Sequence, residues 1–157
     1  MLIRSKKTKK DEAIAYASRL LRVRPRSEKE LRDRLFQKNF RREAVFETIS
    51  FLKENRIIDD LRFADLWVES RLAARPEGGV LLRKELREKG VSSAIIDKVM
   101  AEKAADEAGL VRELARRKYE GLKTFPRRKA RKKVFDFLAR RGFGFDIIED
   151  AVRELEG

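Results

Sequence analysis

Few residue types in this 157-residue chain could do chemistry. The sequence contains no His and no Cys, which excludes imidazole bases, thiolate nucleophiles, disulfides and the commonest zinc ligands. The acidic pair Asp59-Asp60 could serve a metal-dependent nuclease, but a two-metal site needs further carboxylates that converge on it. Asp is also a favoured N-cap residue. We therefore interpret Asp59 or Asp60 as the cap of the helix that follows.

The glycine pair Gly78-Gly79 lacks the features of a phosphate-binding loop. A Walker-type loop requires Lys and then Ser or Thr directly after its glycines, and here Val80 follows. We expect these glycines to form a turn before a helix that begins near Val80. The sequence predicts a protein that is not an enzyme and that has no cofactor and no metal site.

The positive charge of the chain is concentrated in two segments. The net charge is +13, and residues 1–10 hold five basic residues while residues 116–133 hold ten, with Glu120 as the one acidic residue there. The other residues are close to neutral together. A basic run can be a solvated helix face, but charge gathered in this way favours contact with an anionic partner, above all nucleic acid.

The candidate contact residues lie on both sides of Pro126. Pro126 predicts a helix start, because its fixed φ suits the first helical position. Ala130 and Arg131 are expected to face the core, so the other cations should fan out over the solvent side without carboxylate partners. Phe125 is either a hydrophobic staple or a stacking residue for a single strand. The candidate residues are Arg116, Arg117, Arg127, Arg128, Lys129, Lys132 and Lys133.

An internal repeat of about fifty residues organises the chain. Asn39, Gly90 and Gly142 are 51 and 52 residues apart, and apolar residues recur around them in one register. These are Leu31, Leu82 and Val134; Leu35, Leu86 and Leu138; Phe40, Val91 and Phe143; Val45, Ile96 and Ile148; and Ile49, Met100 and Val152. Their i,i+4 spacing predicts helices with one buried face, and no segment alternates as a strand would.

Each repeat is predicted to contain three short helices. In the first copy we place them at 11–23, 28–38 and 42–54, with a capping box from Ser27 and Glu30 at the start of the second. Asn39, Gly90 and Gly142 should each have positive φ just after a helix. The predicted fold is all-α, an elongated tandem array of three three-helix units. Its parts are a basic tail at 1–10 and units at 11–60, 61–104 and 105–157.

Two blocks of the sequence resemble the RecX family of regulatory proteins. The first block is Ala17–Leu21 followed by Arg24–Leu31. The second, which matches better, is Ile58–Ala64, Trp67-Val68, Arg71, Gly78-Gly79 and Glu85–Val91. The resemblance spans about residues 13–155 and is general in the third unit. Asn55 departs from the family pattern, which commonly has Gly before the acidic pair.

This resemblance implies a small cytoplasmic bacterial protein that restrains the RecA recombinase and has no catalysis of its own. The implied partner is the RecA filament on single-stranded DNA, whose strand exchange and ATP hydrolysis the family inhibits, and a monomer is the implied state. No apolar run reaches the length of a signal peptide or of a membrane span. The alternative is a DNA-binding helical module that acts directly on nucleic acid, since three-helix units can be helix-turn-helix domains.

Overall fold

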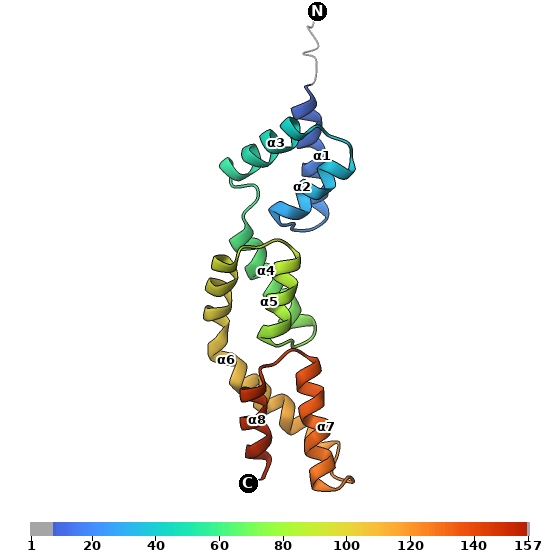
Figure 1. Cartoon of the computed structure of the whole chain (residues 1–157), viewed down its shortest axis with the longest axis vertical. Helices are drawn as coiled ribbons and strands as arrows, with labels where there is room; N and C mark the ends of the chain where they lie inside the picture. The colour runs from blue at the N-terminus through green and yellow to red at the C-terminus, as the bar shows by residue number, and fades with distance from the viewer. Residues whose placement is uncertain (1–7, 157) are drawn as a thin grey trace, which may run out of the picture.

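The computed structural model describes residues 8–156 of the chain, and these residues form helices joined by short turns (Figure 1). No strand occurs within this range, so the prediction of an all-α fold is confirmed. The helices are α1 (Lys9–Val23), α2 (Glu28–Gln37), α3 (Arg42–Glu54), α4 (Asp60–Ala74), α5 (Gly79–Glu88), α6 (Ser93–Glu120), α7 (Arg127–Arg140), α8 (Phe145–Arg153) and the 3₁₀ helix η1 (Glu154–Glu156).

Local signals set the helix boundaries close to the predicted positions. Ser27 and Glu30 form the expected capping box at the start of α2, in which the Ser27 side chain accepts from the Glu30 N–H and the Glu30 side chain accepts from the Ser27 N–H. Just after the ends of α2, α5 and α7, Asn39, Gly90 and Gly142 have φ of 64°, 78° and 82°. The prediction of positive φ is confirmed at all three positions.

The apolar residues gather into three separate cores. The first lies among α1, α2 and α3, the second among α4, α5 and the first half of α6, and the third among the second half of α6, α7 and α8. We call these groups the first, second and third units, and we call α2, α5 and α7 their middle helices. The 28-residue helix α6 is shared by two units, because it contributes Val99 to the second core and Val111 to the third. The sequence-based division at 104/105 falls inside it.

The three units follow one another along the longest axis of the molecule (Figure 1). The first unit is at the top of the view, and α7 and α8 are at the bottom. Each middle helix runs in the same direction, so the C-terminus of α5 faces the N-terminus of α2, and the C-terminus of α7 faces the N-terminus of α5. The expected elongated array is thus present. No helix in the described part of the chain is long and apolar enough to cross a membrane.

Candidate nucleic-acid and partner interface

The middle helix of the third unit has one more turn than its counterparts. α2 and α5 are each 10 residues long, whereas α7 has 14. All three end one residue before a capping residue and its left-handed neighbour, so the added turn lies at the start of α7. Pro126 is the N-cap of α7 and not its first helical residue, which corrects the prediction by one position. We call residues 127–129, which open this added turn, the basic turn.

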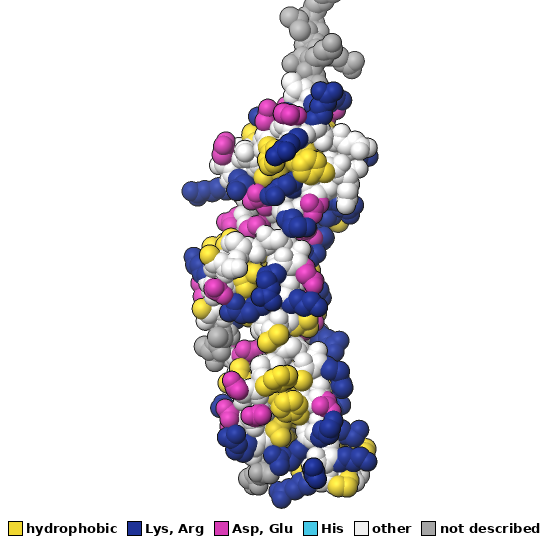
Figure 2. Space-filling model, viewed as in Figure 1, with side chains coloured by type: hydrophobic (Ala, Val, Ile, Leu, Met, Phe, Trp, Pro, Cys, Tyr) yellow, Lys and Arg dark blue, Asp and Glu magenta, His cyan; other side chains and the backbone are white. Residues whose placement is uncertain are grey.

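The basic turn projects into solvent at the lower end of the molecule. Arg127, Arg128 and Lys129 are all exposed, and none of them forms an ion pair with a described residue. Ala130 faces the core with 1% of its surface exposed, and Arg131 is partly buried, as expected. Figure 2 shows Lys and Arg side chains gathered at this end, around the start of α7. Three cations in one turn, without carboxylate partners among the described residues, form a surface that attracts anions.

Other candidate cations do have partners, against the expectation that the group is unpaired. Lys132 Nζ lies 2.8 Å from an oxygen of Asp136, one turn further along α7, and this hydrogen bond holds the pKa of Asp136 below its usual range. Arg117 pairs with Glu113 at 2.6 Å. Lys133 lies 5.1 Å from the centre of the Phe125 ring. The two ion pairs have i,i+4 spacing and follow directly from helical geometry.

Arg116 and Phe125 complete the group around the turn between α6 and α7. Arg116 is exposed near the end of α6 and has no ion pair with a described residue. Phe125 is 40% exposed, and the ammonium of Lys133 lies over its ring. Its ring therefore contacts a cation, an arrangement worth about 0.5–1 kcal/mol at an exposed site. The candidate residues that the structure leaves without an acidic partner in its described part are Arg116, Arg127, Arg128, Lys129 and Lys133.

The acidic pair at the start of α4 caps two different helices. Asp59 is the N-cap of α4, and its Oδ1 accepts from Leu61 N at 2.9 Å. Asp60 instead accepts from Glu28 N at 2.9 Å, at the start of α2 in the first unit. Burial raises the pKa of Asp60, although this hydrogen bond acts in the opposite direction. The prediction of a cap is confirmed for Asp59, while Asp60 joins two units.

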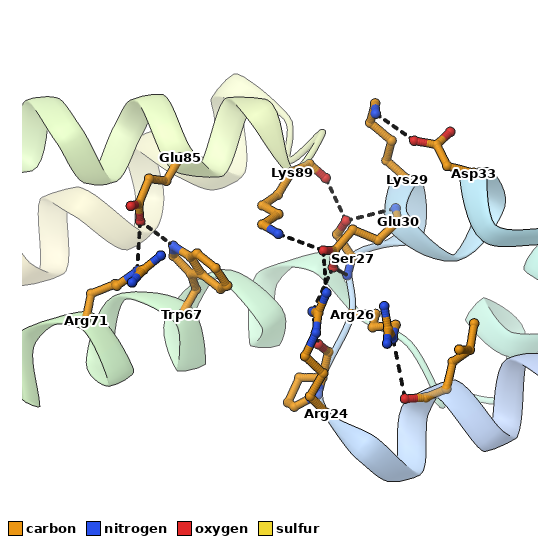
Figure 3. A network of polar contacts seen from close by, with 12 residues as sticks. Arg24, Arg26, Ser27, Lys29, Glu30, Asp33, Trp67, Arg71, Glu85 and Lys89 are labelled. Carbon is orange, nitrogen blue, oxygen red and sulfur yellow. Dashed lines mark hydrogen bonds and ion pairs between the residues drawn. The ribbon is translucent and has the colours of Figure 1, made fainter. Parts of the chain in front are cut away.

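Further contacts reinforce this first junction, between the first and second units (Figure 3). The Ser27 hydroxyl, at the N-cap of α2, donates to the carbonyl of Lys89 at 2.6 Å. Lys89 is the C-cap of α5, so its carbonyl is one of those that a helix leaves unpaired. The N-terminus of one middle helix thus satisfies the C-terminus of the next.

Glu30 is the centre of the ionic contacts at the first junction. Its side chain is 15% exposed and accepts from Lys89 Nζ at 2.8 Å and from Arg24 Nη2 at 2.9 Å. Burial alone raises the pKa of a carboxylate. The hydrogen bonds from Arg24, Lys89 and the Ser27 N–H outweigh that cost and lower the pKa of Glu30 from 4.5 to about 2. Glu30 is therefore a carboxylate whose charge links the two units.

Trp67 extends this network into the second unit. Its indole N–H donates to Glu85 Oε2 at 2.8 Å, and Arg71 Nε donates to the same oxygen at 3.1 Å. The guanidinium of Arg71 and the ammonium of Lys89 lie 4.6 Å and 4.8 Å from the centre of the ring. Two cations therefore flank the ring, and each has an acidic partner, Glu85 or Glu30.

The second junction, between the second and third units, is held by backbone groups. Gly78 N, at the N-cap of α5, donates to the carbonyl of Arg141 at 2.7 Å, and Val80 N donates to Gly142 O at 3.0 Å. Gly78 must be glycine, because a Cβ there would collide with the backbone of Gly142 and Phe143. Gly142 is equally constrained, because its Cβ would collide with Leu81.

The contacts between the units are not among the features predicted from the sequence. The residues that make them are 51 or 52 positions apart in successive units: Ser27 and Gly78 at the N-caps, and Lys89 and Arg141 at the C-caps. The repeat register contained this signal, since two positions that pair across one junction should pair across the next. The sequence does not show in which direction successive units stack, because the periodicity of apolar residues carries no information about that direction.

The fold and the candidate site together define a helical-repeat protein with a basic surface at one end. Models of the first, second and third three-helix domains of RecX match residues 13–52, 59–100 and 105–152. The chain belongs to the RecX family. It is 34% identical to the Regulatory protein RecX of Chlorobium limicola over 93% of this chain and 91% of that one, and 34% identical to that of Clostridium perfringens over 94% and 71%.

Solved structures share the architecture. The crystal structure of RecX from Lactobacillus salivarius matches with a TM-score of 0.87 and 21% identity, over 94% of this chain and 97% of that one. A second crystal structure of regulatory protein RecX matches with a TM-score of 0.78 and 23% identity, over 90% and 70%. At these identities the likeness concerns the fold. A regulatory role follows from the family, and the partner is a separate question.

Proposed function

We propose that this chain is a cytoplasmic, non-catalytic regulator that binds the RecA filament on single-stranded DNA. It lowers strand exchange and ATP hydrolysis by RecA, and in this way it modulates recombination and DNA repair. It acts as a monomer. Family membership supports the regulatory role, and the elongated array supports a filamentous partner, because stacked repeats present a long surface and not a pocket.

The observation that carries the proposal is the basic turn. Its cations lie on a turn that α2 and α5 lack, and they have no acidic partner among the described residues. Acidic side chains are the ones favoured near a helix N-terminus, so cations there are not explained by the stability of α7. Their contact is expected to be electrostatic and insensitive to sequence, as for phosphates.

The test is a charge reversal that leaves the ion pairs intact. Arg128→Glu with Lys129→Glu should keep α7, because acidic residues suit its first turn. Arg87→Glu with Lys98→Glu makes the same change of charge at two exposed residues of the second unit and is the matched control. We expect the first variant alone to lose filament association and inhibition of the RecA ATPase, measured by electron microscopy and by ATP hydrolysis on single-stranded DNA.

The salt dependence sharpens this test. Each phosphate neutralised on a single strand contributes about −0.7 to the slope of log affinity against log salt. Loss of two such contacts should make the slope shallower by about 1.4. Equal association of both charge-reversed variants with the filament, at low and high salt, would show that the basic turn is only a solvated surface.

A further inference from the structure

The first unit has a docking end that no other unit covers. Gly90 and Gly142 need to be glycine partly because Lys29 and Leu81 of the preceding units press against them. Among the described residues, no unit packs against this end of the first unit, where the equivalent position is Asn39, which carries a side chain. The next residue shows the same difference, because Val91 and Phe143 are 4% and 2% exposed while Phe40 is half-buried. We call the surface around Lys38, Asn39 and Phe40 the open end.

An aromatic ring flanked by two cations recurs in each unit, and the open end contains the first of these. Tyr16 has Arg19 and Lys38 near its ring, in the way that Trp67 has Arg71 and Lys89. In the third unit the ring is that of Phe137, between Lys118 and Arg141. The second cation in every case is the C-cap residue of the middle helix.

The cations at the open end lie further from their ring than those of the other two units. They stand 5.8 Å from the centre of the Tyr16 ring, against 4.6 Å and 4.8 Å at Trp67 and 5.0 Å and 4.5 Å at Phe137. Neither Arg19 nor Lys38 forms an ion pair with a described residue, whereas both cations at Trp67 do. Tyr16 also lies beside Phe40, with ring centres 6.1 Å apart.

Two hollows adjoin these rings. One, of about 360 Å³, is lined by Lys9, Lys38, Asn39, Phe40, Arg41 and Glu12. The other, of about 240 Å³, is lined by Tyr16, Arg19, Lys38, Phe40, Ala15 and Glu12. Glu12 is the one acidic side chain in both linings, and it pairs with Lys9 at 3.1 Å. The other cations remain available to an anionic ligand.

The chemistry of the open end fits a nucleic acid better than a second copy or an acidic protein surface. Another copy would bring the start of its α7, where the basic turn would meet Lys38 and Arg41 as like charges. An acidic protein surface would use the cations but not the faces of two adjacent rings. A single strand uses both, because its bases stack on aromatic faces while its phosphates contact cations.

We propose that the open end is a binding site for single-stranded nucleic acid. Arg19 and Lys38, which form no ion pair with a described residue, move from the Tyr16 ring to the phosphates beside Arg41, and bases stack on Tyr16 and Phe40 in their place. This inference deepens the proposed function, because it gives the chain a direct contact with the strand inside the filament. The site lies at the opposite end of the array from the basic turn (Figure 1), so it does not depend on that turn.

The test measures binding of a labelled oligo-dT to the full chain alone, by fluorescence anisotropy. Stacking is worth about 1–3 kcal/mol per base, so Tyr16→Ala should weaken binding about tenfold, while Tyr16→Trp should restore it and show quenched fluorescence on binding. Phe46→Ala is the matched control, since Phe46 is 45% exposed beside Arg42 but lines neither hollow. Circular dichroism and melting check that each variant folds.

An abasic oligomer of equal length separates stacking from charge. We expect it to bind the unmodified chain no better than oligo-dT binds Tyr16→Ala. If Tyr16→Ala binds oligo-dT as the unmodified chain does, the inference is overturned. Weaker binding of oligo-dT by Lys38→Glu would then show that the surface contacts phosphates only. If Tyr16→Ala loses filament association but not oligo-dT binding, the open end meets protein, which also overturns it. If the variant of the basic turn loses filament association and Tyr16→Ala does not, the proposed function is supported and the inference about the open end is overturned.

Discussion

The two junctions between units join the same parts of the chain with different forces. At each one, the N-cap residue of a middle helix donates a hydrogen bond to the C-cap carbonyl of the next middle helix. The first junction does this with the Ser27 hydroxyl and surrounds the contact with the Glu30 ion pairs. The second does it with the Gly78 N–H, and the shared helix α6 holds the two units together.

The two junctions should therefore respond differently to pH and salt. The first junction rests on side-chain charges that protons and salt can alter, and its linker between α3 and α4 is short and non-helical. The second rests on two backbone hydrogen bonds, on a longer contact of 3.4 Å from the Arg141 guanidinium to the Pro76 carbonyl, and on one uninterrupted helix. We therefore expect the angle between the first and second units to respond to solution conditions, and the angle between the second and third units to be fixed.

The largest effect is expected at the second junction, from Gly78→Ala. A Cβ there meets backbone atoms of Gly142 and Phe143, and backbone cannot rotate away as a side chain can. Overpacking of this kind costs about 1–3 kcal/mol, and we expect the upper end, together with a longer molecule in small-angle X-ray scattering. Gly109→Ala is the control, because its Cβ would meet nothing within 4 Å. Urea unfolding should show that control stabilised by up to about 1 kcal/mol.

An intermediate effect is expected at the first junction, from Glu30→Gln. At pH 7 this variant should be less stable by about 2 kcal/mol, because Arg24 and Lys89 lose a partly buried carboxylate. The folded pKa of Glu30 is about 2 and its ordinary value is 4.5. Its contribution is therefore present above about pH 4.5 and is lost as the pH falls toward 2. Urea unfolding at a series of pH values, followed by Trp67 fluorescence, should show the two proteins converge in acid. A constant difference across that range would contradict this account.

The smallest effect is expected from Asp60→Asn at the same junction. An Asn side chain still offers a carbonyl oxygen to Glu28 N, and burial already disfavours the charged form of Asp60. Because the folded pKa of Asp60 is raised, its contribution to stability grows as the pH falls through that pKa, opposite to Glu30. The variant should stay within about 1 kcal/mol of the unmodified chain at pH 7. A larger loss in thermal melting would mean that its charge, and not its acceptor oxygen, joins the units.

Much of the fold could be predicted because each repeat carries its own local signals. The apolar register located the helices, and the alignment of Asn39 with Gly90 and Gly142 located three left-handed turns. The continuity of α6 was missed because the repeat places a boundary at 104/105, although residues 93–120 include no proline and only one glycine, Gly109. Local sequence favours a helix there, whatever the repeat alignment predicts.

The candidate site could be predicted less well, for a physical reason. Exposure of the basic turn followed from helical spacing, and the pairing of Lys132 with Asp136 could have been predicted from the same spacing. The Glu30–Lys89 contact joins residues 59 positions apart, and it exists only once the units stack in a given direction. The open end is defined in the same way, since Phe40 differs from Phe143 through its neighbours and not its own type.

Pro126, the N-cap of α7, affects whether the array of stacked units can continue from one molecule to the next. Repeats that dock head to tail can in principle continue from one molecule to the next and produce fibres, as any heterologous contact does when it fails to close. Ser27 and Gly78 each supply a donor for the following helix, whereas Pro126 has no N–H and its side chain has no hydroxyl. A neighbouring molecule that offered its Lys38 carbonyl would find no donor on the N-cap residue itself, and it would meet three positive charges beside that residue. We therefore expect Pro126 to disfavour polymerisation of the chain, although the same residue is compatible with the start of its last middle helix.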